Sequence, residues 1–435
     1  MPDDLEQEAG QEQEAADAGR SPVSRRGLIA GIAGGVVAGA AAGAGTAAAF
    51  GAARPAHAGE EDASEVVDLA RSHPFYGQGH QAGIETEQQR YSVYMAFDVT
   101  SPVASDLQVL LARWSGAIAQ MMKGLPIGAV EPEGSSAVAL DTGEAYDLSP
   151  ASLTVTVGFG PKLFDDRFGL AAKRPRLLAD LPDLPSDQLQ ADLSGGDLSL
   201  QACADDPQVA YHAIRDLVRM AQGVASTRWT VLGFGRASAG KGQSTPRNLM
   251  GFKDGTRNIK DAADFDRFVW VDDDQPWTRG GSYQIVRKIQ MNIETWDAAG
   301  IGDQQDVFGR TKAVGAPLGG KKEFDAPDFA KRSGDAPVIP VTSHVALAAH
   351  ENNGGVKILR RGYNYTDGLN RYGQLDAGLL FIAYVNDPQH FIALQTRLGR
   401  VDRLNEYIQH IGSGVFFTPR APGPGRYIGQ ELFTE

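Results

Sequence analysis

The sequence predicts an α+β fold built from two similar units, each with an antiparallel sheet. Its first half contains strand-like and helix-like segments in the order strand, helix, strand, strand, helix, strand, which is the order of a ferredoxin-like unit. The second half repeats this theme loosely, without an exact sequence repeat. The chain has 435 residues, of which 42% are hydrophobic and 22% charged, so it is long enough for two globular domains.

The first unit is predicted from four strand-like and two helix-like segments. Alternating apolar residues indicate strands at YSVYMAFDVT (91–100), SLTVTVGFG (152–160), GDLSLQACA and TRWTVLGFGR. Helical spacing indicates helices at 105–122 and 206–222, and the second begins with a capping Asp followed by a Pro. An irregular insertion rich in Pro, Asp and Leu occupies 161–194.

The second unit contains the same kinds of segment. The predicted strands are the start of SYQIVRKIQMNIETW, VKILRRGYNYT and GLLFIAYVND, and HFIALQTRLG is a predicted helix. The Gly- and Pro-containing loop STPRNLMGFKDGTRN lies between the two halves. We therefore predict an N-terminal ferredoxin-like domain over residues 59–244 and a C-terminal one over residues 245–435.

A targeting peptide is predicted at residues 1–58. An acidic leader precedes Arg25 and Arg26, residues 27–50 carry no charge, and a small-x-small site follows at 56–58. This order resembles a twin-arginine signal, which implies export of the folded protein to the cell envelope or the extracellular space. A transmembrane anchor is the alternative, but a run rich in Ala and Gly inserts weakly. We expect a mature chain that begins near Gly59, without a stable membrane anchor.

Charge and cysteine content exclude several classes of protein. The formal net charge is -13 and the basic residues are scattered, so neither nucleic acid nor an anionic membrane is an expected partner. The single cysteine, Cys203, excludes an intramolecular disulfide and is expected in the core. C-x-x-C and H-E-x-x-H patterns are absent from the sequence, which argues against a structural zinc site or a zincin.

The loop between the halves contains a candidate functional motif, Gly251–Gly255, with the sequence GFKDG. An Asp-Gly pair most often forms a tight turn, because Gly tolerates positive φ and Asp hydrogen-bonds nearby backbone. The two glycines would also allow a ligand close to the backbone and hold Asp254 at that surface.

A second candidate segment begins at His344 and leads, 16 residues later, to Arg360 and Arg361. A buried arginine beside an apolar strand requires an anion or a strong acceptor, because an unpaired charge is costly in a low dielectric. A histidine, an aspartate and an arginine could together bind an iron and handle a peroxide.

These segments in this order resemble the dye-decolourising peroxidase family, in its twin-arginine-exported type related to the deferrochelatase/peroxidase group. The resemblance covers essentially the whole predicted mature chain. It rests on FYGQGHQAGI (75–84), TPRNLMGFKDGTRN (245–258), GGSYQIVRKI (280–289), SHVALAAHENN (343–353), ILRRGYNY (358–365) and LDAGLLFIAY (375–384). It implies two ferredoxin-like units of the dimeric α/β-barrel-like type and one haem b per chain, bound mainly in the C-terminal unit.

The resemblance also implies roles for individual residues. The axial ligand of the haem iron maps to His344, the distal aspartate to Asp254 and the distal arginine to Arg360. Further cofactor contacts map to Gly255, Thr256 and Arg257.

The chain departs from the family after the axial ligand. Many members read H-x-R-x-A-x-P-R there, whereas this chain has Ala346, His350 and Glu351. The propionate contacts of residues 349–351 are therefore not carried over.

Three more residues are candidates for supporting roles. Asp376 is the candidate acceptor for the second N–H of the axial histidine, which would raise its basicity; the alternative is a helix or turn cap. Tyr407 and Trp229 are candidates for passing electrons from bulky donors at the surface, although aromatic residues in regular elements are usually core.

Three functional hypotheses follow. The leading one is a secreted haem peroxidase that uses hydrogen peroxide, through a ferryl intermediate, to oxidise bulky aromatic donors such as dyes and phenolic compounds. In it Asp254 would shuttle a proton and Arg360 would stabilise the charge on the leaving oxygen. The second is a deferrochelatase that releases iron from haem, and the third is a non-enzymatic haem carrier outside the cytoplasm.

Overall fold

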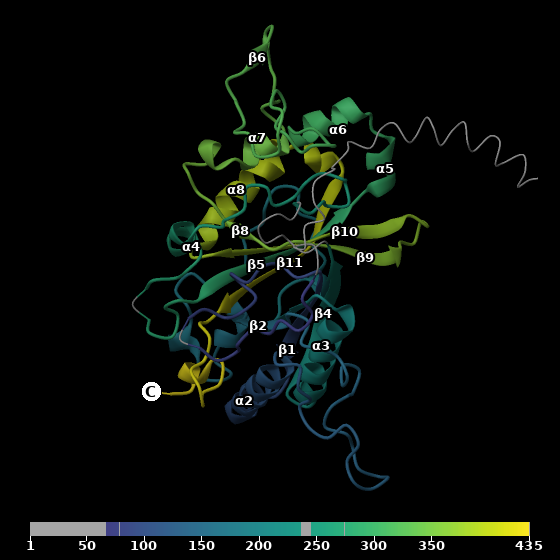
Figure 1. Cartoon of the computed structure of the whole chain (residues 1–435). Coiled ribbons are helices and arrows are strands. Elements are labelled where there is room, and N and C mark those ends of the chain that lie inside the picture. Colours follow the sequence, from purple (N-terminus) through teal and green to yellow (C-terminus); the bar gives the residue numbers. More distant parts are fainter. Residues whose placement is uncertain (1–66, 78, 236–244, 274, 435) are drawn as a thin grey trace, which may run out of the picture. The chain divides into compact units, whose positions relative to one another are not determined.

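The computed structural model describes residues 67–77, 79–235, 245–273 and 275–434 (Figure 1). The predicted targeting peptide at residues 1–58 lies outside these ranges. Within them, no helix has both the length and the apolar character needed to cross a membrane.

The first part of the described chain forms a ferredoxin-like unit. Its main elements are β1 (Tyr91–Val99), α2 (Ala104–Met121), β2 (Thr154–Phe159), β3 (Leu198–Ala204), α3 (Pro207–Ala221) and β4 (Ala225–Phe234). The strands are antiparallel in the order β2-β3-β1-β4. Helices α2 and α3 pack together, and the Trp114 indole donates a hydrogen bond to the Leu217 carbonyl at 2.8 Å. Three short 3-10 helices interrupt the insertion at 161–194.

The second part repeats this arrangement. Its main elements are β5 (Ser282–Met291), β9 (Tyr363–Leu369), β10 (Leu375–Val385), α8 (Pro388–Val401) and β11 (Ile408–Thr418), and the strand order is β11-β5-β10-β9. Shorter elements are α4 (Ala262–Phe268), α5 (Ile293–Ala298), α6 (Ile301–Phe308), β6 (Arg332–Ser333), β7 (Ala336–Pro337), α7 (His344–Ala348) and β8 (Leu359–Arg360). Because strand order and connectivity match the first unit, the predicted α+β fold with two ferredoxin-like units is confirmed.

The two main helices of the repeat begin in the same way. At α3, the Asp206 carboxylate accepts hydrogen bonds from the backbone N–H groups of Gln208 and Val209 at 2.7 and 3.2 Å, and at α8 the Asp387 carboxylate accepts from Gln389 at 2.8 Å. A proline occupies the first helical position in both. A capping Asp followed by a Pro satisfies one exposed donor and sets φ for the first turn.

The sheets of the two units join into one closed sheet of eight strands. β11 pairs with β2, β4 pairs with β9, and β5 pairs with β10, so none of these strands is left as a free edge. Buried polar groups cross the interior: the Gln284 amide donates to Gln201 at 3.0 Å and to Tyr384 at 2.7 Å, and the Tyr94 hydroxyl donates to Gln284 at 3.0 Å.

One predicted strand is divided in the structure. VKILRRGYNYT was expected to be continuous, but β8 ends at Arg360 and β9 begins at Tyr363. β8 pairs with Ala383 and Tyr384 near the end of β10, whereas β9 pairs with its first half. This break places Arg360 on a short separate strand.

Candidate active site

A cavity with a volume of about 480 Å³ lies in the second unit. Its wall comes from β5, α7, β10, α8 and the loop around Asp254. A cavity of this size lies in the range used for cofactors and other small molecules. The lining is largely apolar, with contributions from Ile289, Met291, Phe308, Leu379 and Phe381.

His344 reaches this cavity from the first turn of α7. The hydroxyl of Ser343 caps the helix by accepting from the Ala346 N–H at 3.4 Å, which fixes the backbone at His344. The Nδ1 atom of His344 lies 2.7 Å from Oδ2 of Asp402, a carboxylate whose side chain is only 3% exposed. Because Nδ1 is engaged, Nε2 is the ring nitrogen left to bind a ligand in the cavity.

The prediction that Asp376 is the partner of His344 is wrong. Asp376 lies on β10 and accepts a hydrogen bond from the Gln290 amide at 3.1 Å. Asp402, 58 residues beyond His344, holds the imidazole instead, and its other oxygen caps the next turn by accepting from the Leu404 N–H at 2.9 Å. Sequence reasoning missed Asp402 because no local pattern indicates that the end of α8 returns to α7.

The electrostatic surroundings of His344 favour its charged form. Burial alone would lower the pKa of His344, but the charge and hydrogen bond of Asp402, together with the more distant carboxylate of Asp254, outweigh burial and raise it. The same negative charge would make the imidazole a stronger donor to a metal.

Asp254 and Arg360 line the same cavity and are paired with each other. The Arg360 Nη1 atom donates to Asp254 Oδ1 at 2.6 Å. Asn258 fixes the backbone of Arg360 through two hydrogen bonds, at 2.7 Å to its carbonyl and 2.9 Å from its N–H. Arg361, the residue after β8, does not line this cavity and donates to Gln89 at 2.9 Å. The structure thus brings together His344, Asp254 and Arg360.

Gly255, Thr256 and Arg257 also line the cavity. Gly255 has a φ of +119°, which favours glycine, so the turn needs this residue whatever it binds. The Thr256 hydroxyl donates to Glu323 at 2.9 Å. Arg257, a predicted cofactor contact, makes a two-point ion pair with Glu351, at 2.6 and 3.0 Å. Glu351 is one of the residues at which the chain departs from the family motif.

Two buried residues of the cavity were not predicted. Arg287 is fully buried; its guanidinium bonds Asp187 and Ser413, but its Nε has no hydrogen-bond partner among the described residues. His410 is 3% exposed, its Nε2 accepts from Gln395 at 3.1 Å, and burial lowers its pKa to about 3. Arg287 lies on β5 and His410 on β11, and no local sequence pattern indicated that either side chain faces a cavity.

These groups fit a haem. The largely apolar lining suits a porphyrin ring, His344 would offer Nε2 to the iron, and Arg257, Arg287 and Arg360 would supply positive charge for carboxylates of the cofactor. The Nε of Arg287, a buried donor on this wall, has no acceptor in the part of the chain that the structure describes, so it is available to a carboxylate of the cofactor.

The predicted electron-transfer residues lie in different surroundings. Trp229 is only 4% exposed, stacks on Tyr94 with 5.1 Å between the ring centroids and donates to the Gly195 carbonyl at 2.8 Å, so it lies in the core, as is usual for an aromatic residue in a strand. Tyr407 is partly exposed and packs edge-on against Trp296 at 4.9 Å. The role of either residue in electron transfer stays a prediction.

A closed sheet of two ferredoxin-like units, with a carboxylate-paired histidine facing an Asp–Arg pair across one cavity, defines a class of haem enzymes. Family comparison agrees, since the Dyp-type peroxidase C-terminal model matches residues 245–422 and the N-terminal model residues 81–235. The chain belongs to the Dyp-type peroxidase family; it is a haem-dependent peroxidase and its cofactor is haem.

Similar proteins include curated relatives and solved structures. The deferrochelatase of Escherichia coli K12 is 41% identical over 373 residues, covering 82% of this chain and 86% of the relative. The deferrochelatase of Yersinia pestis is 40% identical over 422 residues, covering 94% of each chain. Ferric DtpA from Streptomyces lividans is 39% identical with a TM-score of 0.78, covering 84% of this chain and 98% of that chain. The DyP-type peroxidase from Cellulomonas bogoriensis is 36% identical with a TM-score of 0.76, covering 84% and 99%.

Proposed function

We propose that this peroxidase uses hydrogen peroxide to oxidise bulky aromatic donors such as dyes and phenolic compounds. One observation carries the proposal: the Asp254–Arg360 pair, 2.6 Å apart, lines the same cavity as His344 held by Asp402. When bound, haem supplies the iron centre that passes electrons from the donor to peroxide.

The residues of the chain have distinct tasks in this proposal. His344 would hold the haem iron through Nε2, and Asp402 keeps the proton on Nδ1 and orients the ring. The Asp254 carboxylate takes a proton from one peroxide oxygen and returns it to the other, so that the leaving oxygen departs as water. Arg360 stabilises the negative charge on that oxygen and, through its ion pair, holds the Asp254 carboxylate in place on the cavity wall.

Two variants test this division of tasks. In stopped-flow mixing with hydrogen peroxide, haem-loaded Asp254→Asn should react roughly 10²- to 10⁴-fold more slowly, because a positioned acid-base group is lost. Arg360→Leu should react roughly 10²- to 10³-fold more slowly, because one charge-stabilising donor is lost. Arg371→Leu, whose side chain lies over Tyr372 on the β9–β10 hairpin, is the control. Unchanged rates in both active-site variants would refute the mechanism.

A second activity, release of iron from haem, is supported equally by the comparisons. The relatives at 40% and 41% identity are both named deferrochelatase. Removal of the iron requires two protons to replace it on the pyrrole nitrogens, and Asp254 is a carboxylate on the cavity wall that could deliver them. Incubation with haem, followed by fluorescence analysis for free porphyrin, tests this activity separately from dye oxidation. Porphyrin formation without turnover of phenolic donors would favour iron release.

We also propose that the protein is exported by the twin-arginine route. Arg25, Arg26 and the small-x-small site at 56–58 support this. Replacement of both arginines by lysine should leave precursor in the cytoplasm, measured by fractionation and immunoblotting. Normal export of that variant would contradict the proposal.

A further inference from the structure

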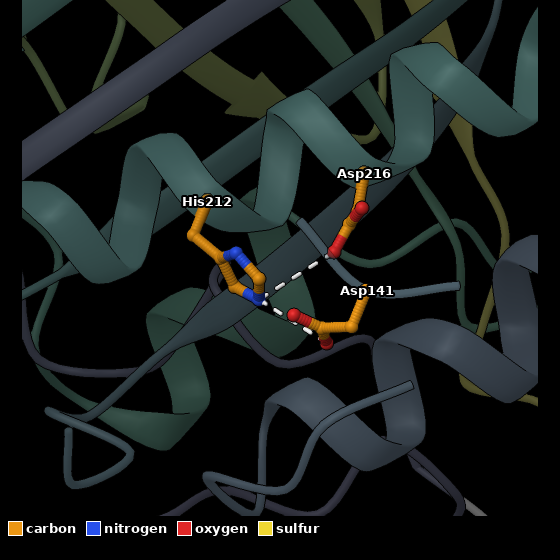
Figure 2. A group of neighbouring side chains, drawn as sticks. All are labelled: Asp141, His212 and Asp216. Carbon is orange, nitrogen blue, oxygen red and sulfur yellow. Dashed lines mark ion pairs between the residues drawn. The ribbon is translucent and has the colours of Figure 1, made fainter. Parts of the chain in front are cut away.

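Three buried side chains form a cluster in the first unit, and none of them lines the haem cavity. His212 and Asp216 lie one turn apart on the same face of α3, and Asp141 comes from the long connection between α2 and β2 (Figure 2). Their exposed fractions are 5%, 0% and 1%, respectively. Figure 2 shows both carboxylates directed toward one edge of the imidazole ring.

The spacing within this cluster is too long for hydrogen bonds. His212 Nε2 lies 3.5 Å from Asp216 Oδ2 and 3.7 Å from Asp141 Oδ2, and one ligand atom from each residue lies within 4.8 Å of the others. Ligand atoms about 2.1 Å from a common ion are roughly 3.0 to 3.5 Å apart in octahedral or tetrahedral geometry. The three groups are thus arranged around a gap close to the size that a metal ion fills.

Asp216 has no adequate partner among the described residues. Its Oδ1 accepts no hydrogen bond, and its Oδ2 has only a 3.5 Å contact from the Thr142 N–H. The guanidinium of Arg219 lies 3.5 Å from Oδ1 but donates its hydrogen bonds to the carbonyls of Ala139 and Leu140. A buried carboxylate oxygen that accepts no hydrogen bond is unfavourable, and a metal ion bound beside it would satisfy it.

The opposite ring nitrogen of His212 is already held. Nδ1 lies 3.0 Å from Glu144 Oε2, and Glu144 is itself paired with Arg215. A carboxylate on Nδ1 fixes the tautomer that presents a free Nε2, as in metal-binding histidines. A cavity of about 20 Å³ adjoins Asp141 and His212, which is room for one water-sized ligand.

We propose that Asp141, His212 and Asp216 bind one divalent first-row transition-metal ion, with Zn²⁺ as the best match. An imidazole nitrogen and two carboxylate oxygens suit zinc, and the adjoining cavity beside Asp141 and His212 has room for a water as fourth ligand. Bound there, the ion ties the α2–β2 connection, through Asp141, to helix α3. This site is separate from the haem and does not depend on the proposed reaction.

Metal content of the haem-loaded protein tests the proposal. After treatment with a chelator, the protein is titrated with Zn²⁺, and in parallel with Mn²⁺ and Ca²⁺, and metal is counted by mass spectrometry. We expect one zinc per chain in addition to the haem iron, with weaker Mn²⁺ binding and no Ca²⁺. Asp216→Asn and His212→Gln should each weaken zinc binding at least about tenfold. The matched control is Asp272→Asn, an acid whose side chain is 90% exposed, and it should bind like the unaltered chain.

Two results would overturn the proposal. Absence of zinc binding by the unaltered chain would mean that the three side chains only join the α2–β2 connection to α3, without a metal ion. Equal zinc binding by His212→Gln would place the ion elsewhere. Circular dichroism and the haem absorption spectrum establish that each variant is folded. X-ray absorption at the zinc edge of the unaltered chain gives an independent readout, because it must show a shell of only nitrogen and oxygen with one imidazole.

Discussion

The Asp402–His344 contact should control how tightly the chain holds its haem and at what potential. Asp402→Asn is the informative change, because asparagine keeps an oxygen that accepts from the Leu404 N–H. It presents an amide NH₂ to the imidazole, however, so both the charge and the hydrogen bond at 2.7 Å are lost. The carboxylate is only 3% exposed, so water screens little of this loss.

The expected magnitude follows from these contacts. Loss of a buried group that orients a metal ligand costs about 10- to 100-fold in affinity, or about 1.4 to 2.7 kcal/mol. In the unaltered chain, the negative charge of Asp402 stabilises ferric iron more than ferrous iron, because the ferric form carries one more positive charge. The reduction potential should therefore rise by about 60 to 120 mV, at 59 mV for each factor of ten.

Two assays measure the effect. Titration of the haem-free protein with ferric haem gives the affinity, and spectroelectrochemistry of the loaded protein gives the potential. Asp376→Asn is the matched control, because that carboxylate bonds Gln290 instead of His344, and it should change neither quantity. A larger shift in Asp376→Asn than in Asp402→Asn would refute the assignment, as would an unchanged potential in Asp402→Asn.

Three other outcomes are expected. His344→Ala should lose the stable haem spectrum while His350→Ala keeps it; the reverse would mean that His350 binds the iron. Burial lowers the pKa of His410 in the folded chain to about 3. Between about pH 6.5 and 3 the unfolded chain therefore binds one more proton at this residue than the folded chain does. As a result, the free energy of unfolding decreases as the pH falls, by up to about 1.4 kcal/mol per pH unit. His410→Gln should flatten that dependence in urea unfolding between pH 6.5 and 4.5, and identical slopes would contradict it. Asp206→Ala should cost about 1 kcal/mol in urea unfolding, because the N-cap of α3 is lost, whereas a change under 0.3 kcal/mol would show that the cap contributes little.

Local sequence patterns were sufficient to predict the main helices and strands and part of the active site. Apolar alternation, helical spacing and the Asp-Pro starts of α3 and α8 depend on neighbours in sequence, so they indicated both units. The motifs around Asp254, His344 and Arg360 are likewise short and contiguous, and the structure brings these three residues to one cavity.

Tertiary structure decided which distant groups meet. Asp376 and Asp402 are both acids near predicted elements, and only the return of the chain after α8 brings Asp402 to Nδ1 of His344. The buried position of Trp229 depends on the closure of two sheets into one. The packing of β5 at the cavity wall leaves the Nε of Arg287 without a partner among the described residues. Asp141 meets α3 because a connection without regular structure folds back across it. Periodicity reports which face of an element is buried, but contacts between elements depend on packing of the whole chain, and a single sequence carries no local signal for them.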